Sequence, residues 1–526
     1  MRVIFRVDAS LEIGSGHVMR CLAIAEILQK NGANVQFITR KHKGHLISNI
    51  ISKGFDVFEL ESYTASNFDD KLYHSNWLGS TQKQDATDCL NIINENKVDW
   101  LIVDHYGIDE DWQKCLKSSC QKLMVIDDLA DRKHQCDMLL DQTFGRQKKD
   151  YKGLVPDNCE LIVGSEYALL RPEFKKWRQY SLDRRKNPTF KELLINLGGI
   201  DSQNITEQVL EILSKCNLPK NINITIVMGA SAPHLKAVKL KASSLPYKTD
   251  FKINVSNMAE IMANSDIAIG ASGSSTWERC CLGLPSIQIV IADNQVFLAE
   301  VLAKNNIIKL TKDNLEIKEL LESSANWMGD LSFSSKNICK GLGVYKVFNK
   351  LANYKIRFNE FEEVNLINYV NLSIEDKLLV LKMRNHVKVK SFMYNDNSIT
   401  ESSHLNFIDS LEDCSDKRYF LIKLHQKVIG AINFHKINLN NSVEFGLYTN
   451  PFIQLKGAGK ILDGIATQFA FFELGVYRIK LEVLVENIRA LNFYYACGYK
   501  LIQTKKFNNK DIFCMEKLNL MGVLNE

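Results

Sequence analysis

Short apolar runs alternate with longer amphipathic stretches along the chain up to about residue 150. Each run has the length and the β-branched content of a buried strand, and residues 17–31 carry apolar side chains at helical spacing. Strands that alternate with helices are typical of βα units, whose strands form a parallel sheet. The pattern predicts strands at residues 3–7, 35–39, 100–104, 123–127 and 138–141.

A second series of such units follows, with predicted strands at residues 193–197, 224–228, 267–270 and 287–290. Two α/β domains in series fit a two-lobed fold whose ligand lies in the cleft between the lobes. Open parallel sheets bind ligands outside the carboxyl ends of their strands, so the turns that follow the strands are candidate sites. We expect Rossmann-like lobes at residues 1–165 and 166–345.

The pattern changes after about residue 345. Residues 346–361 are mixed and polar and are expected to be a linker, and residues 362–518 predict an α+β domain of the size of one small acyltransferase. Its predicted strands are residues 364–370, 419–424, 427–435, 442–449 and 478–485, and its predicted helices are residues 374–385, 400–411, 457–474 and 488–497. The predicted fold class is therefore α/β, with two Rossmann-like lobes followed by an α+β domain.

Composition narrows the class of protein. A chain of 526 residues, 45% of them hydrophobic, forms several domains, and its formal charge of +5 is spread along the length, which argues against nucleic acid as a partner. The 13 cysteines form no C-x-x-C pair, and His134-Gln-Cys136-Asp137 is the nearest approach to a metal site, so no metal is expected. Arg6 and Asp8 interrupt the first apolar run, and no run approaches the ~18 residues of a membrane span, so we expect a cytoplasmic protein without a membrane partner.

A glycine-containing turn, Gly14-Ser15-Gly16, follows the first predicted strand and delivers His17 to the first turn of a helix. The N–H groups and the positive end of that helix favour anions, and glycine lets a ligand approach the backbone closely. A histidine there can take a proton from water at neutral pH. His17 is therefore a candidate catalytic residue, and the alternative is an ordinary capping or core histidine.

Two turns of the second lobe are rich in Gly and Ser and follow predicted strands. Such turns suit a diphosphate, although a plain tight turn has the same composition. Glu278 comes after the second turn, where a carboxylate holds ribose hydroxyls, and the whole pattern resembles the UDP-binding lobe of the GT-B glycosyltransferase fold. The candidate residues of the two turns are Gly198, Gly199, Ser272, Gly273, Ser274 and Ser275.

Residues 1–345 more specifically resemble the UDP-2,4-diacetamido-2,4,6-trideoxy-β-L-altropyranose hydrolases, the PseG type, which are relatives of GT-B transferases that use water as the acceptor. The matching stretches are residues 14–22, 103–107, 126–129, 168–174 and 292–295. The resemblance implies that His17 activates or positions the water that attacks the anomeric carbon and releases UDP. It implies that the substrate-binding residues include Gly14, Gly16, Arg20, Tyr106, Asn294 and Gln295. Asp104 and His105 either close the strand end structurally or act directly in catalysis.

A loop of the last domain follows the strand predicted at residues 442–449 and opens an apolar helix. Its Q-x-x-G-x-G pattern places consecutive N–H groups at a helix start, which suits the pyrophosphate of coenzyme A, although a flexible turn looks the same. Lys456 and Lys460 either attract the phosphates or form an exposed, charged helix start. The candidate residues of the loop are Gln454, Gly457, Ala458, Gly459 and Lys460.

Downstream of that loop, Asn487 is followed by Ala490, Tyr494 and Gly498-Tyr499. Together the two motifs resemble the GCN5-related N-acetyltransferases over residues 362–518. The resemblance implies that two strands splay apart, that acetyl-CoA pairs with one of them, with Leu447, Tyr448 and Asn487 as contacts, and that Tyr494 protonates the leaving thiolate. The neighbouring Tyr495 ring is expected to pack in the core if it has no part in this step. Glu444 either accepts the amine proton through water or faces solvent.

The combination of the two halves in one chain narrows the choice of acceptor substrate for residues 362–518. If residues 1–345 hydrolyse a UDP-linked diacetamido sugar, the acceptor of residues 362–518 is the 4-amino group of the preceding UDP-sugar, as in the PseH type of pseudaminic acid synthesis. The expected partners are UDP-linked amino sugars, acetyl-CoA as co-substrate and other enzymes of the pathway. Two alternatives stay open: a glycosyltransferase with an alcohol or lipid acceptor, and a nucleotide-sugar sensor, either one fused to an amino-sugar or protein N-acetyltransferase.

Overall fold

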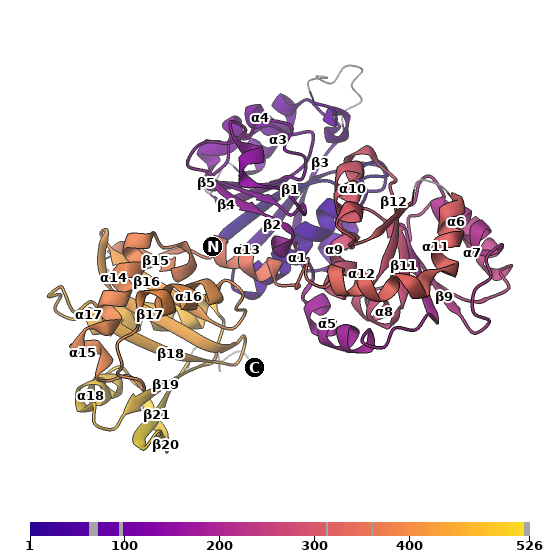
Figure 1. The fold of residues 1–526 in the computed structure, drawn as a ribbon. Coiled ribbons are helices and arrows are strands. Elements are labelled where there is room, and N and C mark those ends of the chain that lie inside the picture. The colour runs from indigo at the N-terminus through magenta and orange to yellow at the C-terminus, as the bar shows by residue number, and fades with distance from the viewer. Residues whose placement is uncertain (63–71, 94–97, 312–313, 360, 520–526) are drawn as a thin grey trace. The chain divides into compact units, whose positions relative to one another are not determined.

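The computed structural model describes residues 1–62, 72–93, 98–311, 314–359 and 361–519. The chain divides into two compact units, which Figure 1 colours along the sequence. One unit consists of Arg2–Ala25 and Asn34–Val344, and the other consists of Met1, Glu26–Ala33 and Tyr345–Glu526.

The N-terminal lobe is built on a parallel sheet with the strand order β3-β2-β1-β4-β5-β6-β7. Its central strands are apolar along most of their length because helices and loops cover both faces. The strands are β1 (Arg2–Val7), β2 (Asn34–Arg40), β3 (Asp56–Leu60), β4 (Val98–Asp104), β5 (Cys120–Ile126), β6 (Met138–Asp141) and β7 (Glu160–Val163). The helices are α1 (Gly16–Lys30), α2 (Ile47–Ser52), α3 (Gln82–Ile93) and α4 (Glu110–Leu116), with a short 3-10 helix η1 (Ser75–Leu78).

The second lobe has a parallel sheet with the order β10-β9-β8-β11-β12-β13. The strands are β8 (Glu192–Asn196), β9 (Asn223–Met228), β10 (Lys248–Ile253), β11 (Ile267–Ala271), β12 (Ser286–Ile289) and β13 (Lys309–Thr311). The helices are α5 (Pro172–Arg184), α6 (Ile205–Leu213), α7 (Leu235–Ser243), α8 (Met258–Asn264), α9 (Ser275–Cys281), α10 (Val296–Lys304), α11 (Asn314–Glu322) and α12 (Met328–Ser335).

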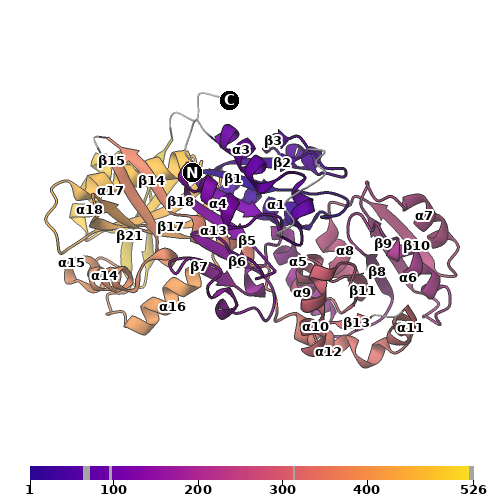
Figure 2. The same ribbon diagram turned by 90° about the horizontal axis from the view of Figure 1, so that it is seen from above.

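Alternate side chains of β8 enter two different cores, one on each face of the second sheet. Leu193 and Ile195 pack with α6, α7 and α11, whereas Leu194 packs with α5, α8 and α9. This is the sandwich expected of a doubly wound α/β lobe, and Figure 2 shows α6 and α7 beside β8–β10. The turns at the carboxyl ends of the strands lie where such lobes bind ligands.

The last domain contains a sheet with the order β14-β15-β16-β17-β18-β19-β21-β20, in which only β18 and β19 are parallel neighbours. Leu421 and Ala431 of this sheet pack against Met383 and Ile408 of the covering helices. The strands are β14 (Tyr354–Phe358), β15 (Phe361–Asn368), β16 (Arg418–Leu424), β17 (Lys427–Asn438), β18 (Ser442–Thr449), β19 (Arg478–Leu484), β20 (Lys500–Phe507) and β21 (Lys510–Leu518). The helices are α13 (Gly343–Leu351), which precedes the sheet, α14 (Ile374–Asn385), α15 (Val387–Lys390), α16 (Glu401–Leu411), α17 (Ala458–Gln468) and α18 (Ile488–Ala496).

The predicted fold class is confirmed, and two segments differ from expectation. Residues 346–361, expected as a linker, contain the end of α13 and strand β14, which pairs with β15 through Tyr354 and Leu366. The helix predicted at residues 457–474 is α-helical only to Gln468 and continues as a π-helical turn, Phe469–Glu473. No helix in the described part of the chain is long and apolar enough to cross a bilayer.

Candidate active sites

The first site lies at the carboxyl edge of the N-terminal sheet, where β1 and β4 are paired neighbours. Val7 of β1 pairs with Asp104, the last residue of β4, so Asp104 lies beside the glycine turn that follows β1. His17 is the second residue of α1, and its Nδ1 is 2.6 Å from Oδ1 of Asp104. The pairing of β1 with β4 therefore brings together a His–Asp pair whose residues are 87 positions apart in sequence.

Arg20, one helical turn after His17, holds Asp104 in place. Its Nε donates to Oδ2 of Asp104 over 2.6 Å and its Nη2 donates to Oδ1 over 2.7 Å. Arg20 also donates to Asp128, whose Oδ2 accepts a further hydrogen bond from the Tyr106 hydroxyl over 2.8 Å. The network of His17, Asp104, Arg20, Asp128 and Tyr106 is buried apart from the partly exposed Asp128.

The charges of this network fix which nitrogen of His17 carries a proton. Burial alone would raise the pKa of Asp104, but the charges of Arg20 and His17 and their hydrogen bonds hold that pKa well below its ordinary value. Asp104 is therefore a carboxylate, and the proton of the 2.6 Å contact belongs to Nδ1 of His17. When His17 is neutral, this arrangement leaves the lone pair on Nε2, and no described residue forms a hydrogen bond to that nitrogen.

Tyr106, which the resemblance assigns to the sugar and phosphate side of the cleft, packs against His17. Its ring contacts His17 edge to face, with the ring centroids 4.6 Å apart. Burial raises the pKa of Tyr106 well above its ordinary value, so the hydroxyl stays protonated and donates to Asp128. His105, in contrast, faces Asp8 and not His17. Its Nδ1 accepts the Gly107 N–H over 3.0 Å, and its Nε2 is 3.4 Å from Oδ2 of Asp8.

The glycine turns of the two lobes face one another across the cleft. A Cβ added at Gly16 would lie 3.2 Å from Oγ of Ser274, and one added at Gly199 would lie 3.4 Å from Oγ of Ser15. Gly14 and Gly198 have φ angles of 80° and 97°, which L side chains rarely adopt. The absence of side chains at Gly16 and Gly199 therefore lets the turns of the two lobes approach each other closely.

A pocket in this cleft brings together four of the predicted residues. Gly16 and Arg20 line it from the N-terminal lobe, and Ser274 and Glu278 line it from the second lobe. Two residues without an earlier assignment, Gln142 and Arg171, complete the polar lining. Burial raises the pKa of Glu278, and Arg171, 3.9 Å away, partly offsets that effect.

The remaining predicted residues of this half lie outside that pocket. Asn294 and Gln295 form the 3-10 turn η5 (Asp293–Gln295), and a Cβ added at Gly273 would lie 3.7 Å from Nε2 of Gln295. The buried Oγ of Ser272 has no partner among the described residues. Residues that the pocket does not include are His17, Tyr106, Gly14, Gly198, Gly199, Ser272, Gly273, Ser275, Asn294 and Gln295.

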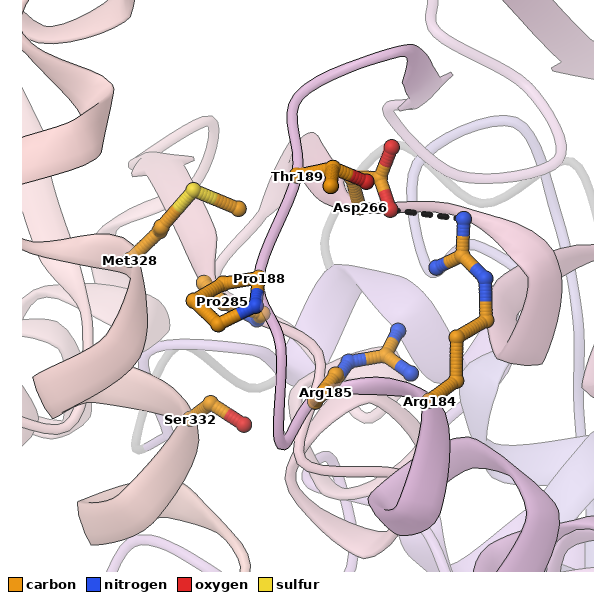
Figure 3. A pocket seen from close by; sticks show the side chains of 8 residues that line it. All are labelled: Arg184, Arg185, Pro188, Thr189, Asp266, Pro285, Met328 and Ser332. Carbon is orange, nitrogen blue, oxygen red and sulfur yellow. Dashed lines mark ion pairs between the residues drawn. The ribbon is translucent and has the colours of Figure 1, made fainter.

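A second hollow of the C-terminal lobe, drawn in Figure 3, lies at the opposite edge of the sheet. Thr189, Asp266 and Pro285 line it, and each of them comes shortly before a strand, at the amino end of β8, β11 or β12. Arg184 is paired with Asp266 over 2.6 Å. The position at the amino ends of the strands indicates a packing feature of the lobe instead of a ligand site.

The second candidate site lies in the last domain, where β18 and β19 separate. Only residues 442–444 of β18 pair with residues 478–480 of β19. Beyond that point Leu447 and Tyr448 pair with β17 on one side and have no β19 partner on the other. The predicted splay is present, and it leaves backbone groups of β18 for an extended amide-containing ligand.

The predicted pyrophosphate loop forms the start of α17. Gly457 is the N-cap with a φ angle of 80°, and no side chain caps the N–H groups of the first turn. The N–H groups of Gly459 and Lys460 are thus open to an anion, whereas the Ala458 N–H donates to the Leu455 carbonyl over 3.2 Å. Gln454 lies just before this turn. Asn487 has a structural task, because its side-chain oxygen accepts the Ala490 N–H over 3.1 Å and caps α18.

Tyr494 and Tyr495 point to different surroundings. Tyr494 is 8% exposed and packs against the rings of Phe493 and Tyr499, whereas Tyr495 is 46% exposed and does not pack in the core. Burial, with a contribution from the charge of Asp463, raises the pKa of Tyr494, so its phenol is protonated at neutral pH. This is the state that a proton donor requires.

The separating strands β18 and β19 each carry a carboxylate, Glu444 and Glu482. Glu444 accepts a hydrogen bond from Lys436 over 2.7 Å and lies 3.2 Å from Nε2 of His435, so it is held by partners and is not simply solvated. Glu482 of β19 accepts from Lys505 over 2.5 Å and from the Tyr394 hydroxyl, and although burial would raise its pKa, these hydrogen bonds lower it. Sequence reasoning missed Glu482. The feature that marks it is its position in the structure, two residues beyond the last residue of β19 that pairs with β18.

Comparison with known proteins gives two family matches. Residues 193–326 match the glycosyltransferase family 28 C-terminal domain, and residues 388–499 match the acetyltransferase (GNAT) family. An uncharacterized protein of Methanocaldococcus jannaschii is 26% identical over 518 residues, which are 96% of this chain and 98% of that protein.

Two relatives with named activities match separate parts of the chain. The UDP-2,4-diacetamido-2,4,6-trideoxy-β-L-altropyranose hydrolase of Campylobacter jejuni is 32% identical over 305 residues, which are 58% of this chain and 97% of the relative. The acetyltransferase PseH of Campylobacter jejuni is 37% identical over 131 residues, which are 25% of this chain and 81% of the relative. With two Rossmann-like lobes of GT-B type followed by an acetyltransferase sheet, the chain belongs to both families, as a fusion of a PseG-type hydrolase with a PseH-type N-acetyltransferase.

Proposed function

We propose that the chain catalyses two consecutive steps of pseudaminic acid synthesis. The last domain acetylates the 4-amino group of UDP-4-amino-4,6-dideoxy-β-L-AltNAc with acetyl-CoA. The first two lobes then hydrolyse the resulting UDP-2,4-diacetamido-2,4,6-trideoxy-β-L-altropyranose to the free sugar and UDP. The named relatives support the two reaction types, and the assignment of these substrates rests on the combination of both families in one chain.

The His17–Asp104 pair is the observation that carries the hydrolase proposal. Asp104 holds the proton on Nδ1, so Nε2 is oriented as a base. A water molecule bound to Nε2 attacks the anomeric carbon, the bond from that carbon to the diphosphate oxygen breaks, and the water proton passes to His17. The N–H groups of the glycine turns stabilise the charge that develops on the leaving UDP.

The acetyl transfer uses groups of the separated strands. The neutral amine attacks the thioester carbonyl carbon, the carbon–sulfur bond breaks, and Tyr494 gives its proton to the sulfur. The proton that the amine loses passes through water to Glu444 or Glu482, which accept hydrogen bonds from Lys436 and Lys505. The open N–H groups at the start of α17 bind the pyrophosphate of the donor.

Mass spectrometry of the full chain, incubated with acetyl-CoA and UDP-4-amino-4,6-dideoxy-β-L-AltNAc, tests both assignments. The wild type is expected to yield free diacetamido sugar and UDP. His17→Ala is expected to stop at the acetylated UDP-sugar, with hydrolysis slowed about 10²- to 10⁴-fold by loss of the base. His45→Ala, which removes an exposed histidine of the same lobe, serves as the matched control.

Two other results would contradict the proposal. Acetyl transfer without UDP release, followed by release only when an alcohol is added, would make the first half a glycosyltransferase. Full turnover by His17→Ala would remove His17 from the mechanism. A chain that binds UDP tightly but never turns over any UDP-sugar would be a sensor.

A further inference from the structure

Two cysteine thiols lie against each other at the amino edge of the N-terminal sheet, opposite the edge that carries the first site. Sγ of Cys136 is 3.6 Å from Sγ of Cys159, and either thiol can donate the hydrogen of this contact. The two residues come shortly before β6 and β7, which are parallel neighbours (Figure 2). Neither thiol belongs to the motifs of the two proposed active sites.

The pairing of the two strands holds the backbones of the cysteines close together. The register joins Met138 of β6 to Glu160 of β7, and the Glu160 N–H donates to the Asp137 carbonyl over 2.9 Å. Each cysteine directly precedes one member of this hydrogen bond. The spacing of paired strands, about 5 Å, lies within the range of Cα separations that a disulfide bridges. Rotation of the side chains is therefore enough to bring the two sulfur atoms to bonding distance.

The two thiols differ in their access to solvent. Cys136 is 3% exposed and belongs to the core of the lobe, whereas Cys159 is half-buried at its margin. The hydrogen bond with Cys159, together with burial, raises the pKa of Cys136, so this thiol is protonated at neutral pH. A small oxidant therefore meets Cys159 first, with Cys136 held beside it as the second thiol.

We propose that Cys136 and Cys159 form a site of reversible oxidation, at which hydrogen peroxide converts the two thiols to an intrachain disulfide. The Cys159 sulfur first takes one oxygen from the peroxide, which gives a sulfenic acid and water. The Cys136 sulfur then attacks the Cys159 sulfur, the sulfur–oxygen bond breaks, and the Cys136 proton leaves with the hydroxide as a second water. The thiols lose two electrons in total, and the peroxide gains them. The inference goes beyond both proposed activities and rests on neither.

The disulfide closes the connection from β6 to β7 into a covalent ring. β7 has four residues, is the last strand of its sheet and, in the described part of the chain, pairs with β6 alone. The connection carries Gln142, and the segment after β7 carries Leu169 and Arg171, all three of which line the cleft pocket. Because a crosslink lowers the entropy of the unfolded chain, the oxidised protein is more stable than the reduced protein.

Peptide mapping by mass spectrometry tests the site. The full chain is reduced, freed of reductant, treated with a small excess of hydrogen peroxide under native conditions, and then unfolded and alkylated. The wild type is expected to yield linked peptides that contain Cys136 and Cys159, and dithiothreitol is expected to restore both thiols. Cys159→Ser is expected to lack the link, and Cys115→Ser, which removes an exposed thiol of α4, is expected to keep it. Free thiols at both positions, a sulfinic acid at Cys159 beside a free Cys136, or a link between two chains overturns the inference.

Thermal melting shows whether the bond fits the native sheet. A bond that fits is expected to raise the melting temperature of the hydrolase half by about 5 °C, and dithiothreitol is expected to remove the increase. Cys159→Ser, whose other thiols meet the same oxidant, is expected to melt at the same temperature after both treatments. An oxidised wild type that melts at or below the temperature of the reduced protein overturns the proposal, because the bond then strains the sheet.

Discussion

Asp104 has its effect through His17, and its removal tests this positioning role. In Asp104→Asn the amide nitrogen can point at Nδ1, which would then give up its proton and move it to Nε2, the wrong position for a base. We expect kcat for UDP release to fall about 10²- to 10⁴-fold while KM and the inhibition constant of UDP change little. Steady-state kinetics beside Asp56→Asn, an exposed carboxylate of β3, check this. Wild-type kcat in Asp104→Asn would show that the carboxylate does not orient the base.

The same carboxylate predicts how stability depends on pH. The pKa of Asp104 in the folded protein is well below its ordinary value, whereas in the unfolded chain it is about 3.9. Its stabilising contribution is therefore complete above about pH 5 and is lost as the pH falls below about 4. We expect the melting temperature of the wild type to fall more steeply between pH 5 and pH 3 than that of Asp104→Asn. Parallel calorimetric profiles would exclude this linkage.

Sequence reasoning located individual residues of the site better than their partners. His17 follows a glycine turn and is local in sequence, so the turn pattern found it. Its link to Asp104 depends on the pairing of β1 with β4, and its link to Trp77 depends on a segment between β3 and α3, both of which are tertiary contacts. Asp104 was therefore weighed as a strand-end residue or a direct catalytic group and not as the partner of His17, and Trp77 gave no signal at all.

At the level of elements, the start of α17 permits a sharp test because two glycines there have different conformations. Gly457 has a φ angle of 80° and open space around its Cβ position, so Gly457→Ala is destabilising by about 1–2 kcal/mol through backbone strain alone. Gly459 lies inside the helix, where an added Cβ meets Phe493 at 3.6 Å, an ordinary contact, so Gly459→Ala is neutral or stabilising by up to about 1 kcal/mol.

In urea unfolding, the free energy of unfolding is therefore expected to fall in Gly457→Ala and to stay unchanged or rise in Gly459→Ala. In Gly457→Ala the KM for acetyl-CoA is also expected to rise, because the strained turn no longer presents its N–H groups in one arrangement. If both variants lost the same stability, the positive φ of Gly457 would not be the cause.

Two elements of the last domain were predicted with their exact bounds. The helix at residues 374–385 and the strand at residues 442–449 agree with the structure to the residue. Strand β20 was missed because most of its side chains are exposed and its sequence is polar. Strand β14 was read as linker because only alternate residues, such as Tyr354 and Ile356, face the core.

For the whole molecule, the fusion predicts that the two activities are separable by single substitutions and benefit from covalent linkage. His17→Ala is expected to retain acetyl transfer, and Tyr494→Phe is expected to retain hydrolysis of the diacetamido substrate. An equimolar mixture of these two variants contains half as many working sites of each kind as the same total amount of wild type. In the mixture, the two kinds of working site lie on separate chains. At low enzyme concentration we expect wild type at matched site concentration to release UDP with a shorter lag, because the intermediate forms near the second site. Equal lags would mean that the intermediate always equilibrates with the solution first.

The separation of β18 from β19 has a consequence for handling the protein. Beyond residue 444 the strand exposes a row of N–H and C=O groups toward the gap, which is an unpaired strand edge inside an otherwise continuous sheet. Unpaired edges are templates on which other chains assemble into aggregates. An acetyl donor that pairs with β18 would also cover this edge. Preparations kept with coenzyme A are therefore expected to remain monodisperse by light scattering for longer than preparations from which it has been dialysed.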